Sequence, residues 1–63
     1  MDFKNLRTVK QLAAESPFSE GTIRYWIFYS ETNGFSRCIV KIGGRIYIDL
    51  EQFNIWLEEH RLG

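Results

Sequence analysis

Residues 18–29 read FSEGTIRYWIFY, which combines the start signals of a helix with apolar residues at helical spacing. Ser19 is a good N-cap, because its hydroxyl can accept a hydrogen bond from a backbone N–H that has no partner inside the helix. Phe18 and Ile23 stand on either side of this cap at the spacing of a hydrophobic staple. The stretch therefore predicts an amphipathic helix over residues 19–30.

The outer face of this helix carries polar and aromatic groups. Its members are Gly21, Thr22, Arg24, Tyr25, Phe28 and Tyr29. A guanidinium, two phenols and a hydroxyl, with one position that lacks a side chain, suit contact with the phosphate-lined groove of DNA. An ordinary amphipathic helix with aromatic padding explains the same residues equally well. The face by itself leaves both interpretations open.

A first helix is predicted just before this one, over residues 8–16. Thr8 is its expected N-cap, and Gln11 stands at the position that completes a capping box. Pro17 ends the helix, because proline disfavours helical geometry in the residue before it. Only Pro17 and Phe18 then precede the next cap, and two helices joined by a tight turn form a helix-turn-helix.

These two helices resemble a known family. The segments TVKQLA at residues 8–13 and SEGTIRYW at residues 19–26 are similar to the opening of the MerR superfamily and its excisionase-like relatives. In that family the second helix enters the major groove of DNA, and an arginine and the tyrosine after it contact the backbone. The resemblance implies these two roles for Arg24 and Tyr25.

Residues 39–48, IVKIGGRIYI, give the signal of a β-hairpin after a loop that is predicted over residues 30–38. A two-residue turn at the two glycines would mix apolar and polar side chains on each face. A three-residue loop, Gly43 to Arg45, would put the apolar residues on one face, and we expect burial of that face to set the register. Its members would be Val40, Ile42, Ile46 and Ile48. This loop puts Arg45 at the hairpin tip and Lys41 on the outer face, in a hairpin that resembles the wing of excisionase-like domains.

An arm and a last helix complete the predicted chain. Residues 1–7 show no periodicity and are expected to form a flexible arm, whereas Asp49 is expected to cap a helix over residues 49–61. The predicted core draws on the helices and the hairpin. Its members are Val9, Leu12, Ala13, Ile23, Trp26, Ile27, Val40, Ile42, Ile46, Ile48, Leu50, Phe53 and Leu57.

Composition narrows the possible classes of protein. Sixty-three residues make one domain, residues 1–63, near the lower size limit for unaided folding. Cys38 is the only cysteine and His60 the only histidine, so one chain can form neither a disulfide nor a zinc site with nitrogen and sulfur ligands. We find no catalytic triad or P-loop, and expect no enzyme, cofactor, metal or small-molecule substrate. No apolar run approaches the length of a membrane span, and the lone cysteine favours a cytoplasmic protein.

Net charge is zero, but the charges are segregated along the chain. Residues 1–48 carry seven basic and four acidic side chains, whereas residues 49–63 carry four acidic side chains and one basic one, giving +3 and −3. A neutral total argues weakly against nucleic-acid binding. The segregation nevertheless allows the basic part to face DNA while the acidic last helix faces away.

The expected fold is α+β, a small winged helix-turn-helix of helix, helix, β-hairpin wing and C-terminal helix. The expected function is binding of double-stranded DNA, with the second helix in the major groove and Thr22 on a base edge. The predicted contact residues are Ser19, Gly21, Thr22, Arg24, Tyr25, Lys41 and Arg45.

The resemblance implies an accessory, architectural role in recombination of phage or mobile elements. An integrase or recombinase, or further copies of the protein on adjacent DNA sites, would then be its partners. The alternatives are a MerR-like transcriptional regulator with the same binding mode and, in another class, a protein-interaction module. Such a module would use Phe28, Tyr29 and the acidic helix.

Overall fold

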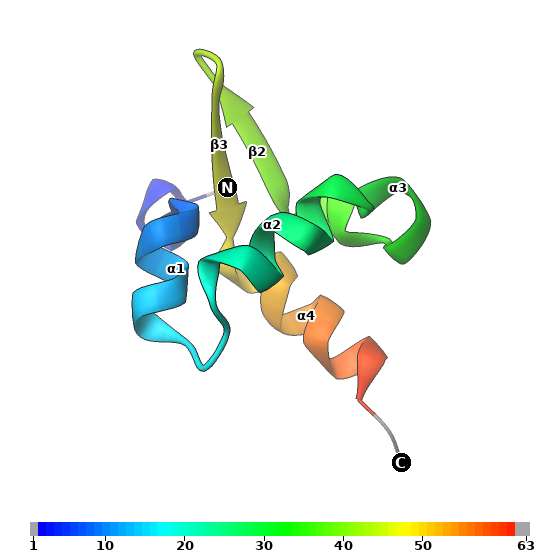
Figure 1. Cartoon of the computed structure of the whole chain (residues 1–63). Helices are drawn as coiled ribbons and strands as arrows, with labels where there is room; N and C mark the ends of the chain where they lie inside the picture. The colour runs from blue at the N-terminus through cyan, green and yellow to red at the C-terminus, as the bar shows by residue number, and fades with distance from the viewer. Residues whose placement is uncertain (1, 62–63) are drawn as a thin grey trace.

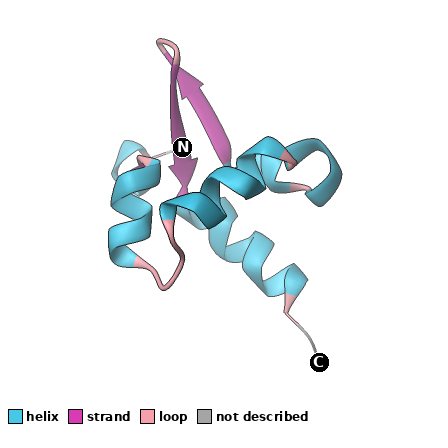
Figure 2. Cartoon of the chain, in the orientation of Figure 1, coloured by secondary structure: helices cyan, strands magenta, loops and turns pink. Residues whose placement is uncertain are grey.

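The computed structural model describes residues 2–61, so that Met1, the first residue of the predicted arm, and residues 62–63 of the domain lie outside the described residues. Within residues 2–61 the chain forms an α+β fold of four α-helices, two short 3-10 helices and a three-stranded antiparallel sheet (Figures 1 and 2). The helices are α1 (Val9–Glu15), α2 (Glu20–Phe28), α3 (Ser30–Asn33), α4 (Leu50–His60), η1 (Phe3–Asn5) and η2 (Phe35–Cys38). The strands are β1 (Leu6–Arg7), β2 (Ile39–Ile42) and β3 (Arg45–Asp49).

Capping residues fix where the three longer helices begin, as predicted. Thr8 and Gln11 form the full capping box of α1, since the Thr8 N–H donates to Gln11 Oε1 at 3.0 Å and the Gln11 N–H to Thr8 Oγ1 at 3.1 Å. The Ser19 hydroxyl accepts the Thr22 N–H at 3.1 Å, and Asp49 accepts the N–H groups of the first turn of α4. Each cap satisfies donors that have no partner inside the helix, which places the helix starts close to the predicted positions.

The segment predicted as a loop over residues 30–38 is mostly helical, and the loop prediction is wrong. α2 ends at Phe28, and α3 and η2 follow on either side of Gly34, which adopts a left-handed φ of +78°. Asn33 holds this segment in place, because its side chain donates to the Trp26 carbonyl and accepts the Phe35 N–H. The segment folds over the core because Phe35 and Cys38 are both fully buried.

The flexible arm predicted over residues 1–7 is also wrong for the described residues 2–7. They form η1 and then β1, which pairs with β3 through Leu6 opposite Asp49 and Arg7 opposite Ile48. The Arg7 guanidinium reaches Glu15 Oε2 of α1 at 2.8 Å and donates to the carbonyl of Leu6. β3 is therefore the central strand of the sheet, with β1 on one side and β2 on the other.

The predicted three-residue loop of the hairpin is wrong as well. Ile42 pairs with Arg45, so the turn contains only Gly43 and Gly44, whose φ angles are +58° and +80°. Positive φ at both positions is typical of a type I′ turn, which matches the twist of the paired strands. Directly opposed side chains share a face, so the expected all-apolar face does not form.

Burial does not decide the register because the hairpin tip projects beyond the body of the molecule (Figure 1). Ile42, a predicted core residue, is 53% exposed, and Val40 lies outside the core cluster. Only the base of the hairpin reaches the core, through Ile48, which is fully buried, and through Ile39 and Ile46, which pack against it.

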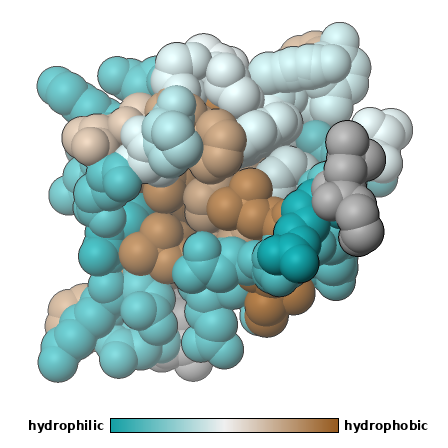
Figure 3. All heavy atoms as spheres, turned by 90° about the horizontal axis from the view of Figure 1, so that it is seen from below, coloured by the Kyte–Doolittle hydropathy of each residue, from teal (hydrophilic) through white to brown (hydrophobic). Residues whose placement is uncertain are grey.

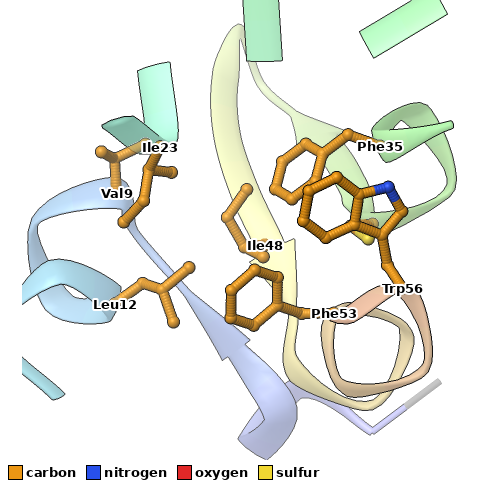
Figure 4. Packing of buried hydrophobic residues seen from close by; sticks show 8 residues of the cluster. Val9, Leu12, Ile23, Phe35, Ile48, Phe53 and Trp56 are labelled. Carbon is orange, nitrogen blue, oxygen red and sulfur yellow. The ribbon is translucent and has the colours of Figure 1, made fainter. Parts of the chain in front are cut away.

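The core joins the helices to the base of the sheet. Its buried members are Val9, Leu12, Ile23, Phe35, Cys38, Ile48, Phe53 and Trp56. In Figure 4 Val9, Leu12 and Ile23 lie on one side of Ile48, and the rings of Phe35, Phe53 and Trp56 lie on the other. The other predicted core members from the helices, Ala13, Trp26, Ile27, Leu50 and Leu57, are partly buried against this cluster.

The side of the molecule that is lowest in Figure 1 keeps part of its apolar surface uncovered. In the view from below, hydrophobic residues gather in the middle of the face with hydrophilic residues around them (Figure 3). Among residues 2–61, the helices are too short and too polar for any of them to cross a membrane.

Candidate functional site

All seven side chains or backbone positions that the sequence predicts as DNA contacts are exposed. Three of them, Ser19, Gly21 and Thr22, lie at the start of α2. The Ser19 hydroxyl donates to Thr22 Oγ1 at 3.0 Å while it accepts the Thr22 N–H, so the two side chains hold each other at the helix start. This arrangement uses one lone pair of Thr22 Oγ1 and leaves its hydroxyl hydrogen and its methyl group for an outside contact.

Arg24 and Arg45 come together at a groove between the start of α1, the outer side of α2 and the hairpin. The groove has a volume of about 530 Å³. Its lining residues are Thr8, Val9, Lys10, Arg24, Ile27, Phe28, Gly44, Arg45, Ile46 and Tyr47. Three of the side chains are cationic, and none of the described residues that line the groove is acidic. The groove therefore combines an apolar lining with positive charge.

The cations of this groove are available to an outside anion. Within residues 2–61, Lys10 and Arg45 form no ion pair, and neither does Lys41. Arg24 lies 3.7 Å from Glu20 on the same helix, and its side chain is 67% exposed. An exposed pair of this kind contributes only about 0.3–0.5 kcal/mol, so a phosphate could replace the carboxylate at little cost.

The structure separates Tyr25 and Lys41 from this groove. Tyr25 lies on another side of α2 and lines a second hollow. Trp26, Tyr29 and Trp56 also line this hollow. Lys41 is on β2 and does not line the groove. It is directly opposite Ile46 and so shares the face of Ile46 and the buried Ile48, which means that its predicted place on the outer face is wrong. Of the seven predicted contacts, the structure thus brings two side chains, Arg24 and Arg45, into one lining.

Sequence reasoning missed Lys10 and Tyr47 as members of this lining. Lys10 lies in the first turn of α1, in a segment whose sequence indicates a capped helix and the family resemblance but no contact with the hairpin. Tyr47 belongs to a hairpin whose register was predicted incorrectly. The approach of α1 to the hairpin depends on the β1–β3 pairing, and no local pattern in residues 1–7 indicates that pairing.

Two other arginines are engaged in the structure and do not line the groove. Arg7 pairs with Glu15, and Arg37 of η2 pairs with Glu59 of α4. The hydrogen bond that Arg37 donates to the Glu59 carboxylate raises the pKa of Arg37. These contacts tie β1 to α1 and η2 to α4, so both arginines serve the fold.

Cys38 is buried in the core rather than presented at a site. Burial raises the pKa of its thiol from 9.0 to about 11, while the neighbouring Arg37 acts in the opposite direction. A thiol with a raised pKa is a poor nucleophile near neutral pH, because the thiolate is the reactive form. Among residues 2–61, no three histidine, cysteine, aspartate or glutamate side chains gather closely enough to hold a metal ion.

Comparison of the chain with models of protein families, with curated proteins and with solved structures gave no match.

Proposed function

We propose that this protein binds double-stranded DNA as a small winged helix-turn-helix domain of the excisionase-like and MerR kind. The observation that carries the proposal is the groove that Lys10, Arg24 and Arg45 line together, with no acidic side chain among the described residues of its lining. Cationic side chains that converge from two helices and a hairpin suit the phosphates of one DNA strand, and phosphate contacts supply much of the affinity in such complexes.

In the proposed complex α2 lies in the major groove and the β2–β3 hairpin acts as the wing. Thr22 offers its methyl group and hydroxyl to base edges, and Gly21 beside it lets the helix backbone approach closely. Arg24, Tyr25 and Arg45 hold phosphates, as Lys41 does from β2. The Ser19 cap keeps Thr22 oriented, since the two side chains are hydrogen-bonded at 3.0 Å.

The role that fits such a domain is an accessory, architectural factor in site-specific recombination of phage or mobile elements. A recombinase, or further copies of the protein on adjacent sites, would be its partners. A transcriptional regulator with the same binding mode is the alternative role. Both rest on the resemblance of residues 8–13 and 19–26 to that family, and an integrase gene beside this one would favour recombination.

Titration of a labelled duplex of random sequence at several salt concentrations tests the binding. Affinity should fall with salt with a log–log slope of about −0.9 for each neutralised phosphate. Arg45→Ala should weaken binding to all duplexes alike and reduce the steepness of the slope by about one unit, because one phosphate contact is lost.

Arg61→Ala is the matched control, since it removes the same type of side chain from a position beyond α4. This arginine pairs at 3.4 Å with Glu58 and is 71% exposed. Its removal should leave both the affinity and the salt slope unchanged. Failure of the wild-type protein to bind duplex DNA at low salt would refute the proposal.

A second candidate function, a protein-interaction module, is favoured by one specific observation. Tyr25, Phe28 and Tyr29 are 56%, 79% and 49% exposed, and their rings form a contiguous patch at the end of α2. Exposed aromatic clusters are typical of protein-binding surfaces. Absence of DNA binding in the titration, with the protein folded, would favour this candidate.

A further inference from the structure

The groove contains aromatic side chains that contact with duplex phosphates does not use. Phe28 and Tyr47 both belong to its lining. The Phe28 side chain is highly exposed, at 79%, and its ring centroid lies 4.9 Å from that of Tyr29 with the planes at 74°. The Tyr29 ring in turn lies 4.8 Å from that of Tyr25, so Phe28 is supported from one side and open on the other.

The rings of Phe28 and Tyr47 share one lining with Lys10, Arg24 and Arg45. An aromatic face beside arginine and lysine side chains is the combination with which proteins hold unpaired nucleotides, because the base stacks on the ring and the phosphate meets the cation. Bases inside a paired duplex are already stacked on one another, so a fully paired duplex leaves such a ring without a base to contact.

The size and polarity of the groove agree with one nucleotide as its occupant. Small-molecule sites enclose about 300–1,000 Å³, and this groove encloses about 530 Å³. Val9, Ile27 and Ile46 give it apolar surface, which suits a base better than a hydrated sugar or phosphate. The positive charge, without an acidic residue among the described lining residues, favours an anionic partner over a neutral or basic one.

We infer that the groove takes one unpaired nucleotide of the bound DNA, with its base against Phe28 and its phosphate between Arg24 and Arg45. The inference rests on the proposed function and names the DNA ligand more closely. That ligand is DNA with an unpaired base at the point where a strand passes between α2 and the hairpin. The DNA would be recognised partly by this local unpairing and not only by its paired sequence.

Fluorescence anisotropy with two labelled duplexes tests the inference. One duplex is fully paired, and the other has the same sequence with one unpaired, bulged nucleotide. The bulged duplex should bind about tenfold more tightly, within the 5- to 150-fold range that corresponds to 1–3 kcal/mol for one stacked base. Phe28→Leu should remove this preference, so that the variant binds the two duplexes with equal affinity, and Phe28→Tyr should retain the preference.

Phe3→Leu is the matched control, because Phe3 is equally exposed, at 78%, but lies in η1 and does not line the groove. Melting temperatures of all variants should equal that of the wild type, since the substituted rings lie at the surface. Equal affinity of the wild type for the two duplexes, or a preference that survives in Phe28→Leu, would overturn the inference and leave duplex binding standing. Absence of binding to either duplex would instead overturn the proposed function.

Discussion

Cys38 shows how one buried side chain makes stability depend on pH. The folded protein raises the pKa of this thiol to about 11 from 9.0 by removing it from water. An unfolded chain releases the thiol proton near the lower value and the folded chain only near the higher one. The folded state therefore binds more protons than the unfolded state between these two values, and its stability must fall as pH rises through this window.

We expect the free energy of unfolding to decrease between pH 9 and pH 11 by about 2 kcal/mol from this group, at about 1.36 kcal/mol for each unit of pKa shift. Urea unfolding at a series of pH values measures the slope. Cys38→Ala lowers stability at every pH because it leaves a cavity, but it should have a flatter slope across this window. Parallel curves for the two proteins would show that Cys38 is not the source.

In the hairpin turn, backbone geometry determines the conformation more than side-chain burial does. A Cβ on Gly43 would meet nothing within 4 Å, yet its φ of +58° is a conformation that residues with a side chain rarely adopt. Alanine there should therefore strain the backbone without any steric contact. Asparagine tolerates this conformation and is favoured at the same position of a type I′ turn.

Gly43→Ala should destabilise the protein by about 1–2 kcal/mol, the cost of a left-handed residue that carries a Cβ. Gly43→Asn is the matched variant and should unfold close to the wild-type denaturant concentration. Chemical denaturation of the three proteins gives the comparison. Equal losses in the two variants would mean that contacts of the turn, rather than its φ angle, determine the effect.

Elements with local signals were predictable from sequence, and elements set by tertiary contacts were not. Thr8, Ser19 and Asp49 mark the starts of α1, α2 and α4 through their own neighbours in the chain. The helical segment around Phe35 depends instead on its burial between distant residues, and β1 depends on pairing with β3. The hairpin register differs from the predicted one because its tip lies in solvent, where burial of an apolar face cannot set the pairing.

In the candidate site, too, some features have local sequence signals and others depend on tertiary packing. The outer face of α2 and the exposed Arg45 could be read from helical spacing and from the hairpin signal. The convergence of Arg24 with Lys10 and Tyr47 on one groove could not, because it follows from how α1, α2 and the hairpin pack. Residue identity indicated the kind of chemistry, and packing determined which side chains share a lining.

At the scale of the whole molecule, ion pairs neutralise part of the negative charge that the sequence places in the last helix. Arg37 of the basic part pairs with Glu59 of the acidic helix, and Glu58 pairs with Arg61. Exposed pairs of this kind add little stability, typically 0–1 kcal/mol each. They do, however, compensate part of the acidic end of α4, while Lys10 and Arg45 lie on the groove side without an ion pair among the described residues.

The sheet order also has a consequence for how molecules behave at high concentration. β2 is an outer strand, and its far edge has no strand partner within residues 2–61. Apart from Lys41, its residues are all β-branched and apolar, with Ile42 at the tip 53% exposed. A lysine on such an edge opposes strand-to-strand pairing between molecules, because joining two edges would bring like charges together and bury them.

Lys41→Val would turn β2 into an uninterrupted apolar edge, and we expect this variant to aggregate at concentrations where the wild type stays monomeric. Static light scattering over a concentration series measures the difference, and Lys4→Val, in η1 outside the sheet, is the control. Similar scattering from both variants would show that the edge needs no protection. If Lys41 does protect it, the side chain serves colloidal stability as well as the proposed DNA contact. Weaker DNA binding by a Lys41 variant would then report on both.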